Sequence, residues 1–372
     1  MGFISGLQLN ELFFREAVAP ILVSAFPGLR YSAARIGPGS DVLGYDSERS
    51  TDHGWGPGLT LFLSDGDHAK FAASIAAELS VRLPTTFRGY STSYDDSPRR
   101  GTRGFQSAEP GRVNHDVAIE SLWDFLRAML DIDPQQPLKP VEWLLMPQQA
   151  LLEVTEGRVF HDGLGELNPI RTKLAWYPHD VWLYMLASQW TRIAQEEPFV
   201  GRCAEVGDEV GSRVVAARIV RDLMRLCFLL ERRYAPYGKW LGTAFARLDC
   251  ATELGSILDS VMGAPALAER QRHLSAAYEA AARMHNRLAI TAPLDPAVRK
   301  FHDRPYLVLD AERFAKALLD SMTDPELKRI YATAGPIGGI DQFADSTNLL
   351  GRTDLRAHLL GLFAAAHNRS NS

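Results

Sequence analysis

The stretch GPGSDVLGYDSERSTDHGWGP, residues 37–57, decides the fold that we expect for this chain. It holds the pair Gly39-Ser40, then a polar segment, and then Asp52 shortly before the apolar run LTLFL at 59–63. Glycine lets a tight turn bring backbone N–H groups close to a phosphate, and serine adds a further donor. Taken alone, the stretch predicts either a plain turn or a phosphate-binding turn followed by a carboxylate that can hold Mg²⁺.

The segments on either side of this stretch alternate between strand and helix patterns. Residues 29–37, 59–63 and 113–120 are predicted to be strands, and 157–167 a hairpin. Helices are predicted at 65–83, capped by Ser64, at 122–130, capped by Ser121, at 11–26, capped by Asn10, and from Pro140 to about residue 155.

From about Tyr177 onward the pattern becomes helical. Apolar residues recur at helical spacing over 179–197, 210–234, 265–289 and 310–322. We therefore predict an α+β protein, with a mixed β-sheet domain at 1–170 followed by an α-helical domain at 171–372.

The composition excludes several classes of protein. The 372 residues carry a formal net charge of −5, which argues against long nucleic acid as a partner. The sequence shows neither the basic start and apolar core of a signal peptide nor an apolar run of membrane-spanning length, so we expect a cytoplasmic protein without a membrane partner. Three widely spaced cysteines predict reduced thiols and no zinc site.

The chain as a whole resembles a known group of proteins. The segment GSDVLGYDSERSTDHGWGPGLTLFL is similar to the nucleotidyltransferase superfamily that includes the kanamycin and lincosamide nucleotidyltransferases. More closely, the chain resembles a bacterial nucleotidyltransferase-like domain family of unknown function. The matching segments are STDHGWGP, RVFHD, YPHDVWLYMLASQWTRIAQEEPFVGR, VGDEVGSRVVAARIVRDLMRLCFLLERRYAPYGKW, FHDRPYLV and GGIDQFADST, and they extend over nearly the whole chain.

This resemblance implies a nucleotidyltransferase-like sheet domain and roles for particular residues. Gly39 and Ser40 would form the phosphate turn, and Asp52 would be the first metal carboxylate. The family has a second acid where this chain has Gly54, and Asp41 is a candidate to replace it. A third acid belongs on the strand at 113–120, where Ala118 stands at the expected position. Two neighbours on the same strand face are candidates for that role, Asp116 and Glu120.

The helical half contributes further candidates. Arg218, Asp222 and Arg225 share one helix face, where they would bind a phosphate or an acceptor or would form a structural ion-pair network. Lys239 is placed to reach a phosphate, with Tyr234, Tyr237 or Trp240 as stacking partners, unless this segment only packs at a helix end. Glu196 and Glu197 would line a cleft or end a solvated helix.

Two more candidates lie near the phosphate turn and in a polar loop. His53 would orient Asp52 or contact a phosphate, or would pack behind the turn. Arg99, Arg100 and Arg103 lie in a Gly-, Ser- and Pro-rich segment, which predicts either a lid over a triphosphate or a solvated loop.

These observations favour a nucleotide-binding enzyme that moves a nucleoside monophosphate from a nucleoside triphosphate to a small-molecule acceptor. Asp52 would hold Mg²⁺ with help from Asp41, Asp116 or Glu120 would act as the base, and the cleft would lie between the two domains. Because Gly54 removes one carboxylate, two alternatives stay open. One is a metal-independent nucleotide hydrolase that cuts an N-glycosidic bond, and the other is a nucleotide-binding protein without catalysis.

Overall fold

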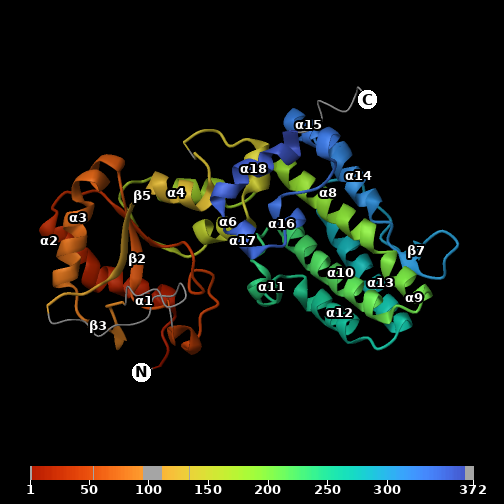
Figure 1. The fold of residues 1–372 in the computed structure, drawn as a ribbon, viewed down its shortest axis with the longest axis horizontal. Helices are drawn as coiled ribbons and strands as arrows, with labels where there is room; N and C mark the ends of the chain where they lie inside the picture. The colour runs from red at the N-terminus through yellow and green to blue at the C-terminus, as the bar shows by residue number, and fades with distance from the viewer. Residues whose placement is uncertain (1, 53, 95–110, 134, 365–372) are drawn as a thin grey trace. The chain divides into compact units, whose positions relative to one another are not determined.

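The computed structural model describes residues 2–52, 54–94, 111–133 and 135–364. The chain forms two compact units (Figure 1). The first unit comprises Met1–Leu138 and Ala150–Ala175, and the second comprises Lys139–Gln149 and Trp176–Ser372. A mixed sheet in the first unit and a helical second unit confirm the α+β class. The segment Lys139–Gln149 groups with the second unit, although the sequence placed it within the domain at 1–170.

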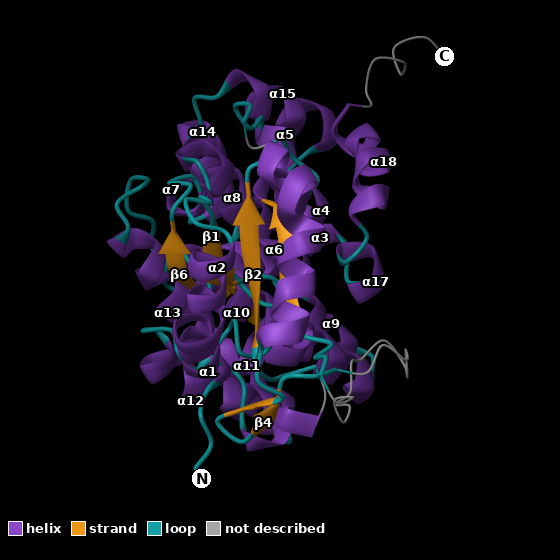
Figure 2. Ribbon diagram, turned by 90° about the vertical axis from the view of Figure 1, so that its left-hand side faces the viewer, coloured by secondary structure: helices purple, strands orange, loops and turns teal. Residues whose placement is uncertain are grey.

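The first unit is built on a four-stranded sheet in the order β5-β2-β1-β6 (Figure 2). Strand β1 is antiparallel to both of its neighbours, and β2 is parallel to β5. The strands are β1 Ser32–Arg35, β2 Gly58–Leu63, β5 Asp116–Ser121 and β6 Arg158–Asp162. The end of β1 and the starts of β2 and β5 therefore lie side by side, on the side of the sheet that is formed by strand ends. We call this side of the sheet the Arg35 edge, after the residue that ends β1.

Strand β2 is buried along its whole length, as its apolar sequence predicts. The helix α3, Asp65–Arg82, connects β2 to β5, as a parallel strand pair requires. Its first turn is capped by Ser64, whose side chain accepts a hydrogen bond from the backbone N–H of Asp67. Ser121 caps α4, Leu122–Leu130, in the same way. Both predicted caps are confirmed.

The N-terminal helix differs from the prediction. It begins at Gly6 as α1, Gly6–Phe13, and continues through a π-helical turn, η1 Phe14–Val18, into α2, Ala19–Ala25. Asn10 therefore lies inside the helix and not at its start. Its buried amide accepts a hydrogen bond from the backbone N–H of Gly58 at 2.8 Å and so connects the helix to the start of β2.

Two other predicted elements are also wrong in part. The helix predicted at 140–155 divides into α5, Pro140–Leu145, and α6, Gln148–Thr155, because Pro147 lacks the N–H that a continuous helix needs. Residues 157–167 do not form a hairpin, since β6 pairs with β1 and the chain then enters α7, Leu167–Leu174. A short hairpin instead joins β3, Thr86–Phe87, and β4, Tyr90–Ser91.

The second unit packs around α8, His179–Glu196, which is buried over most of its length, and α10, Glu209–Leu230. A two-stranded ladder joins β7, Arg299–Lys300, to β8, Leu307–Val308. In the described part of the chain, no helix combines the length and the apolar character needed to cross a bilayer. The remaining helices of the unit are α9 Phe199–Glu205, α11 Gly238–Phe245, α12 Ala251–Gly263, α13 Leu267–Arg287, α14 Glu312–Ser321, α15 Pro325–Ala334, α16 Ile340–Phe343, α17 Thr347–Leu350 and α18 Thr353–Ala364.

Candidate functional site

A buried ion pair lies at the Arg35 edge of the sheet. Arg35 Nε lies 2.7 Å from Asp41 Oδ2, and its Nη2 lies 3.1 Å from Oδ1. The Arg35 side chain is 14% exposed and that of Asp41 is 3% exposed. Burial by itself disfavours the charged guanidinium, but Asp41 outweighs this effect and raises the pKa of Arg35. Both oxygens of Asp41 are thus engaged within the protein.

The glycine of the predicted phosphate turn packs against this pair. A Cβ at Gly39 would lie 2.4 Å from Asp41 Oδ1 and 3.1 Å from Arg35 Nη2. Any side chain would therefore push the ion pair apart. Ser40 follows, and its carbonyl accepts a hydrogen bond from the N–H of Tyr45 at 2.8 Å, which closes the turn. Gly39 and Ser40 as phosphate ligands stay a prediction.

Of the two acids proposed on β5, Asp116 lies at the Arg35 edge. It is the first residue of the strand and pairs with Gly58, and its charge contributes to the raised pKa of Arg35. Glu120 pairs with Phe62, four residues along the strand and so about 13 Å away. Burial raises the pKa of Glu120. The two acids share a strand face but do not belong to one cluster.

Asp52 is the last residue of the short 3₁₀ helix Glu48–Asp52 and is exposed. Gly54 has φ +61°, which is the left-handed region that favours glycine. His53 lies outside the described residues, as do Arg99, Arg100 and Arg103.

Another acid of the same stretch, Asp46, was missed by the sequence analysis. Its Oδ2 accepts hydrogen bonds from the N–H of Gly6 at 2.6 Å and from Trp55 Nε1 at 3.0 Å. Asp46 therefore holds the start of α1 against the stretch that follows Asp52.

The structure does not group the described carboxylates of the first unit into a set of three metal ligands. Both oxygens of Asp41 face Arg35, and Glu120 lies at the other end of β5 from Asp116. Within residues 2–52, 54–94, 111–133 and 135–364, no three His, Cys, Asp or Glu side chains are grouped so that they could hold a metal ion. Asp52 as a metal ligand stays a prediction.

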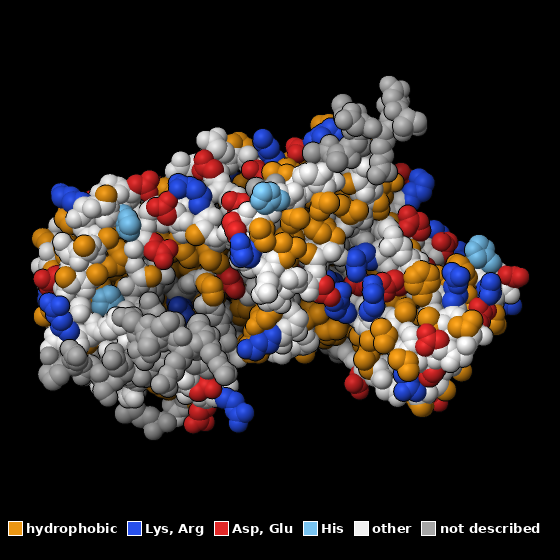
Figure 3. Space-filling view, viewed as in Figure 1, with side chains coloured by type: hydrophobic (Ala, Val, Ile, Leu, Met, Phe, Trp, Pro, Cys, Tyr) orange, Lys and Arg blue, Asp and Glu red, His pale blue; other side chains and the backbone are white. Residues whose placement is uncertain are grey.

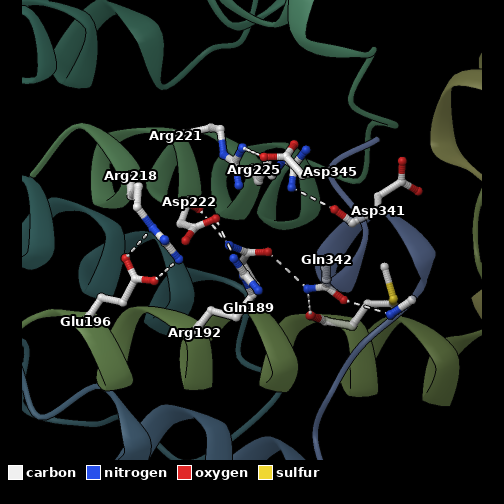
Figure 4. A network of polar contacts seen from close by, with 12 residues as sticks. Gln189, Arg192, Glu196, Arg218, Arg221, Asp222, Arg225, Asp341, Gln342 and Asp345 are labelled. Atoms are coloured by element: carbon white, nitrogen blue, oxygen red, sulfur yellow. Dashed lines mark hydrogen bonds and ion pairs between the residues drawn. The ribbon is translucent and has the colours of Figure 1, made fainter. Parts of the chain in front are cut away.

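In the second unit, the candidates on α10 belong to a polar network that runs between α8 and α10 (Figure 4). The guanidinium of Arg218 donates to both carboxylate oxygens of Glu196. Asp222 is 1% exposed, and its Oδ1 lies 3.6 Å from Arg192 Nε on α8. The carbonyl of Asp222 accepts from Gln189 Nε2 at 3.0 Å. Arg218 and Glu196 therefore form an ion pair, and their roles in binding stay a prediction.

Two arginines one turn apart continue this network toward α16. Arg221 Nη1 donates to Asp345 Oδ2 at 2.6 Å, and Arg225 Nη1 donates to the carbonyl of Asp341 at 2.7 Å. Gln342 Nε2 donates to Gln189 Oε1 at 3.0 Å and so joins α16 to α8. Sequence reasoning found Arg225 but missed Arg221, although both lie on the helix at 210–234.

The other two candidates of the helical half have different surroundings. Glu197 is buried and accepts the backbone N–H groups of Leu309 at 2.7 Å and Ala311 at 3.0 Å. Burial raises its pKa to about 7. Lys239 is exposed in the first turn of α11, with its Nζ 4.7 Å from the ring centroid of Trp240. The hydrogen bonds of Glu197 thus stabilise the start of α14. The side chain of Lys239 is exposed to solvent.

Acidic and basic side chains are mixed on the face of the helical unit that Figure 3 shows. The ion pairs of this unit include Arg218–Glu196, Arg221–Asp345 and Arg283–Glu253. Nucleic acid as an excluded partner, and nucleotide as an expected one, both stay predictions.

Comparison with known proteins gives limited matches. The family described as "Domain of unknown function (DUF4037)" matches residues 143–241, which include α8 and α10. No curated protein matches the chain. A solved structure of a nucleotidyltransferase-like protein from Exiguobacterium sibiricum is similar over 83% of this chain and 89% of its own, with 10% identity and a TM-score of 0.30. At that TM-score the likeness carries no argument about the present chain.

Proposed function

We propose that the protein binds a nucleoside triphosphate at the Arg35 edge and transfers the nucleoside monophosphate to a small-molecule acceptor. One observation supports this most strongly. The sheet brings the Gly39-Ser40 turn, the start of β2 and Asp116 to the same edge, beside a guanidinium. A phosphate-binding turn and a carboxylate must lie close together for this chemistry.

In this proposal each residue has a defined task. The N–H groups of the turn at Gly39 and Ser40 bind phosphate oxygens. Asp116 accepts the proton of the attacking hydroxyl. Arg35 adds positive charge near the phosphates while it holds Asp41 in place. Mg²⁺ bound by Asp52 would neutralise charge on the phosphates, and no step is assigned to it.

A second candidate function is favoured by the Arg35–Asp41 pair. Because both oxygens of Asp41 bind Arg35, this function assigns the catalytic role to Asp116, and one carboxylate with a water is enough for hydrolysis of an N-glycosidic bond. In that case the protein cuts a nucleotide into a base and a sugar phosphate without a metal. Binding without catalysis is the third outcome.

The test is a product analysis by mass spectrometry. The protein is incubated with nucleoside tri- and monophosphates and with a pool of small hydroxyl and amine compounds, once with Mg²⁺ and once with a chelator. Pyrophosphate and a nucleotidylated product support the transfer. Free base in both samples supports the hydrolase and refutes the transfer, and nucleotide binding without any product leaves the third reading.

Two variants locate the activity. We expect Asp116→Asn to lower the rate by about 100-fold or more, because it removes the proton acceptor. Glu120→Gln is the matched control on the same strand face, and it should leave the rate nearly unchanged. Equal effects of both variants would contradict a site at the Arg35 edge.

A further inference from the structure

A small enclosed cavity in the second unit lies beside the polar network of Figure 4. Its volume is about 130 Å³. Polar side chains and the start of α11 line much of it, and we call it the Arg225 pocket. The residues that carry the argument are Arg221, Arg225, Gly238, Asp341, Asp345 and Thr347. All of them belong to the second unit.

The positive charge of Arg225 is poorly compensated. Arg221 and Arg225 lie four residues apart on α10, and like charges at this spacing repel. The hydrogen bond of Arg225 goes to the carbonyl of Asp341, which is a neutral acceptor. Among the described residues, no carboxylate forms an ion pair with Arg225. Burial and the charge of Arg221 lower the pKa of Arg225, and together they outweigh the charges of Asp341, Asp222 and Asp345, which raise it.

Neither Asp341 nor Asp345 forms an ion pair with Arg225, because each carboxylate has another partner. The carboxylate of Asp341 accepts the backbone N–H of Gln148 at 2.9 Å. Asp345 pairs with Arg221, but its side chain is 70% exposed. An exposed pair of this kind contributes little to stability. An anion that binds Arg221 more tightly would therefore displace Asp345 from it.

We propose that the Arg225 pocket binds the phosphate group of a small organic phosphate, or free inorganic phosphate. Arg221 and Arg225 supply planar donors that match phosphate oxygens, and the phosphate displaces Asp345 from Arg221. Gly238 places the first backbone N–H groups of α11 at the pocket, where they favour an anion.

The size of the pocket limits the ligand. Sites for whole drug-sized molecules or cofactors usually measure about 300–1,000 Å³. The pocket therefore has room for a phosphate and a few more atoms, but not for a complete nucleotide. This inference does not depend on the proposed nucleotidyl transfer.

Isothermal titration calorimetry tests the proposal on the full chain. Inorganic phosphate and glycerol 3-phosphate are titrated separately at constant ionic strength, with acetate as a carboxylate probe. We expect at least one phosphate compound to bind, and the tighter of the two identifies the source of the phosphate. Acetate binding more tightly than both phosphate compounds would overturn the assignment, as would no binding of either.

Three variants locate the site. Arg225→Gln should weaken binding by about tenfold or more, because it removes a charged donor. Asp345→Asn should tighten binding by about threefold, because the exposed competitor for Arg221 loses its charge. Arg283→Gln is the control, since Arg283 forms an exposed ion pair with Glu253 and does not line the pocket. If Arg225→Gln does not fold, Asp345→Asn decides: unchanged or weaker binding in that variant overturns the proposal.

Discussion

Among single residues, the pair Arg35–Asp41 has the strongest influence on the first unit. Two charges that are almost fully removed from water stabilise each other, but either one alone would be left buried without compensation. The same pair explains why position 39 is glycine. It therefore sets the shape of the turn whether or not a phosphate binds there.

Removing one partner of this pair should be costly. We expect Arg35→Met to lower the free energy of unfolding by about 3 kcal/mol, because Asp41 then stays buried and charged. Urea unfolding followed by circular dichroism measures the change. Arg127→Met, which breaks the exposed pair with Asp124, is the control and should cost less than about 1 kcal/mol. If the double variant Arg35→Met with Asp41→Leu is no more stable than Arg35→Met alone, the ion-pair explanation is wrong.

His285 should make the stability of the protein depend on pH. It is buried between Trp190 Nε1, 3.3 Å from its Nδ1, and Thr291 Oγ1, 3.0 Å from its Nε2. Burial lowers its pKa from 6.5 to about 4. The unfolded chain thus binds a proton below about pH 6.5, whereas the folded chain does so only near pH 4. Stability is therefore lost as the pH falls through this window, by about 2 kcal/mol between pH 7 and pH 5.

The comparison of wild type with His285→Asn at both pH values isolates this effect. The variant lacks the titrating ring, so its free energy of unfolding should fall by about 2 kcal/mol less over the same interval. Glu197 acts in the opposite sense in both proteins, since its raised pKa stabilises the folded state as the pH falls through about 7. It therefore cancels in the difference. Identical pH dependence in the two proteins would mean that His285 accepts a proton in the folded state.

On the scale of elements, caps decide where the helices begin. Ser64 accepts the N–H of Asp67 at 3.2 Å and starts α3 directly after β2. The helix therefore turns back at once and lets β5 lie parallel to β2. The chain returns through α3 and the β3–β4 hairpin, and β5 then begins with Asp116 beside Gly58 at the Arg35 edge.

Ser64→Ala should cost about 1 kcal/mol of unfolding free energy, because the N–H of Asp67 loses its acceptor. Ser64→Gly should cost only a few tenths of a kcal/mol, since glycine is well tolerated at this position. Thermal and urea unfolding of the two variants measure the order. A larger loss in the glycine variant would show that the Ser64 side chain does not act as a cap.

On the scale of the whole molecule, the second unit depends on a segment that comes before the end of the first. Trp143, Leu144 and Leu145 on α5 are buried, and Trp143 packs edge-on against Tyr177 with 5.9 Å between the ring centroids. Gln148 Oε1 accepts the N–H of Ala235 at 2.6 Å. The helical unit is therefore assembled from two separate parts of the chain.

A fragment of residues 176–372 should consequently not fold like the full chain. It lacks α5 and exposes the apolar surface that α5 covers, so we expect it to bind a hydrophobic dye and to lose a cooperative urea transition. Adding a synthetic peptide of residues 139–149 in excess should partly restore the transition. A sharp transition of the fragment alone would show that the helical unit does not need the segment.

Much of the local structure could be predicted from the sequence. Local sequence patterns report interactions between residues that are close together in the chain. Such interactions produce the buried strand at 59–63, the caps Ser64 and Ser121, and the long helix α10. The helix predicted at 11–26 is present, but the cap predicted at Asn10 was wrong. The amide of Asn10 instead accepts the N–H of Gly58, which lies 48 residues further along the chain. No local pattern contains this partner.

The sequence by itself determined the α+β class, most strands and helices, and the position of the glycine-serine turn. Only the tertiary structure decided that Asp41 is bound by Arg35, that Asp116 and not Glu120 lies at that edge, and that α5 belongs to the helical unit. The tertiary structure also formed the Arg225 pocket, where Arg225 donates a hydrogen bond to the carbonyl of Asp341, 116 residues further along the chain. Hydrogen bonds, ion pairs and burial depend on which distant residues meet, and that information exists only once the chain has folded.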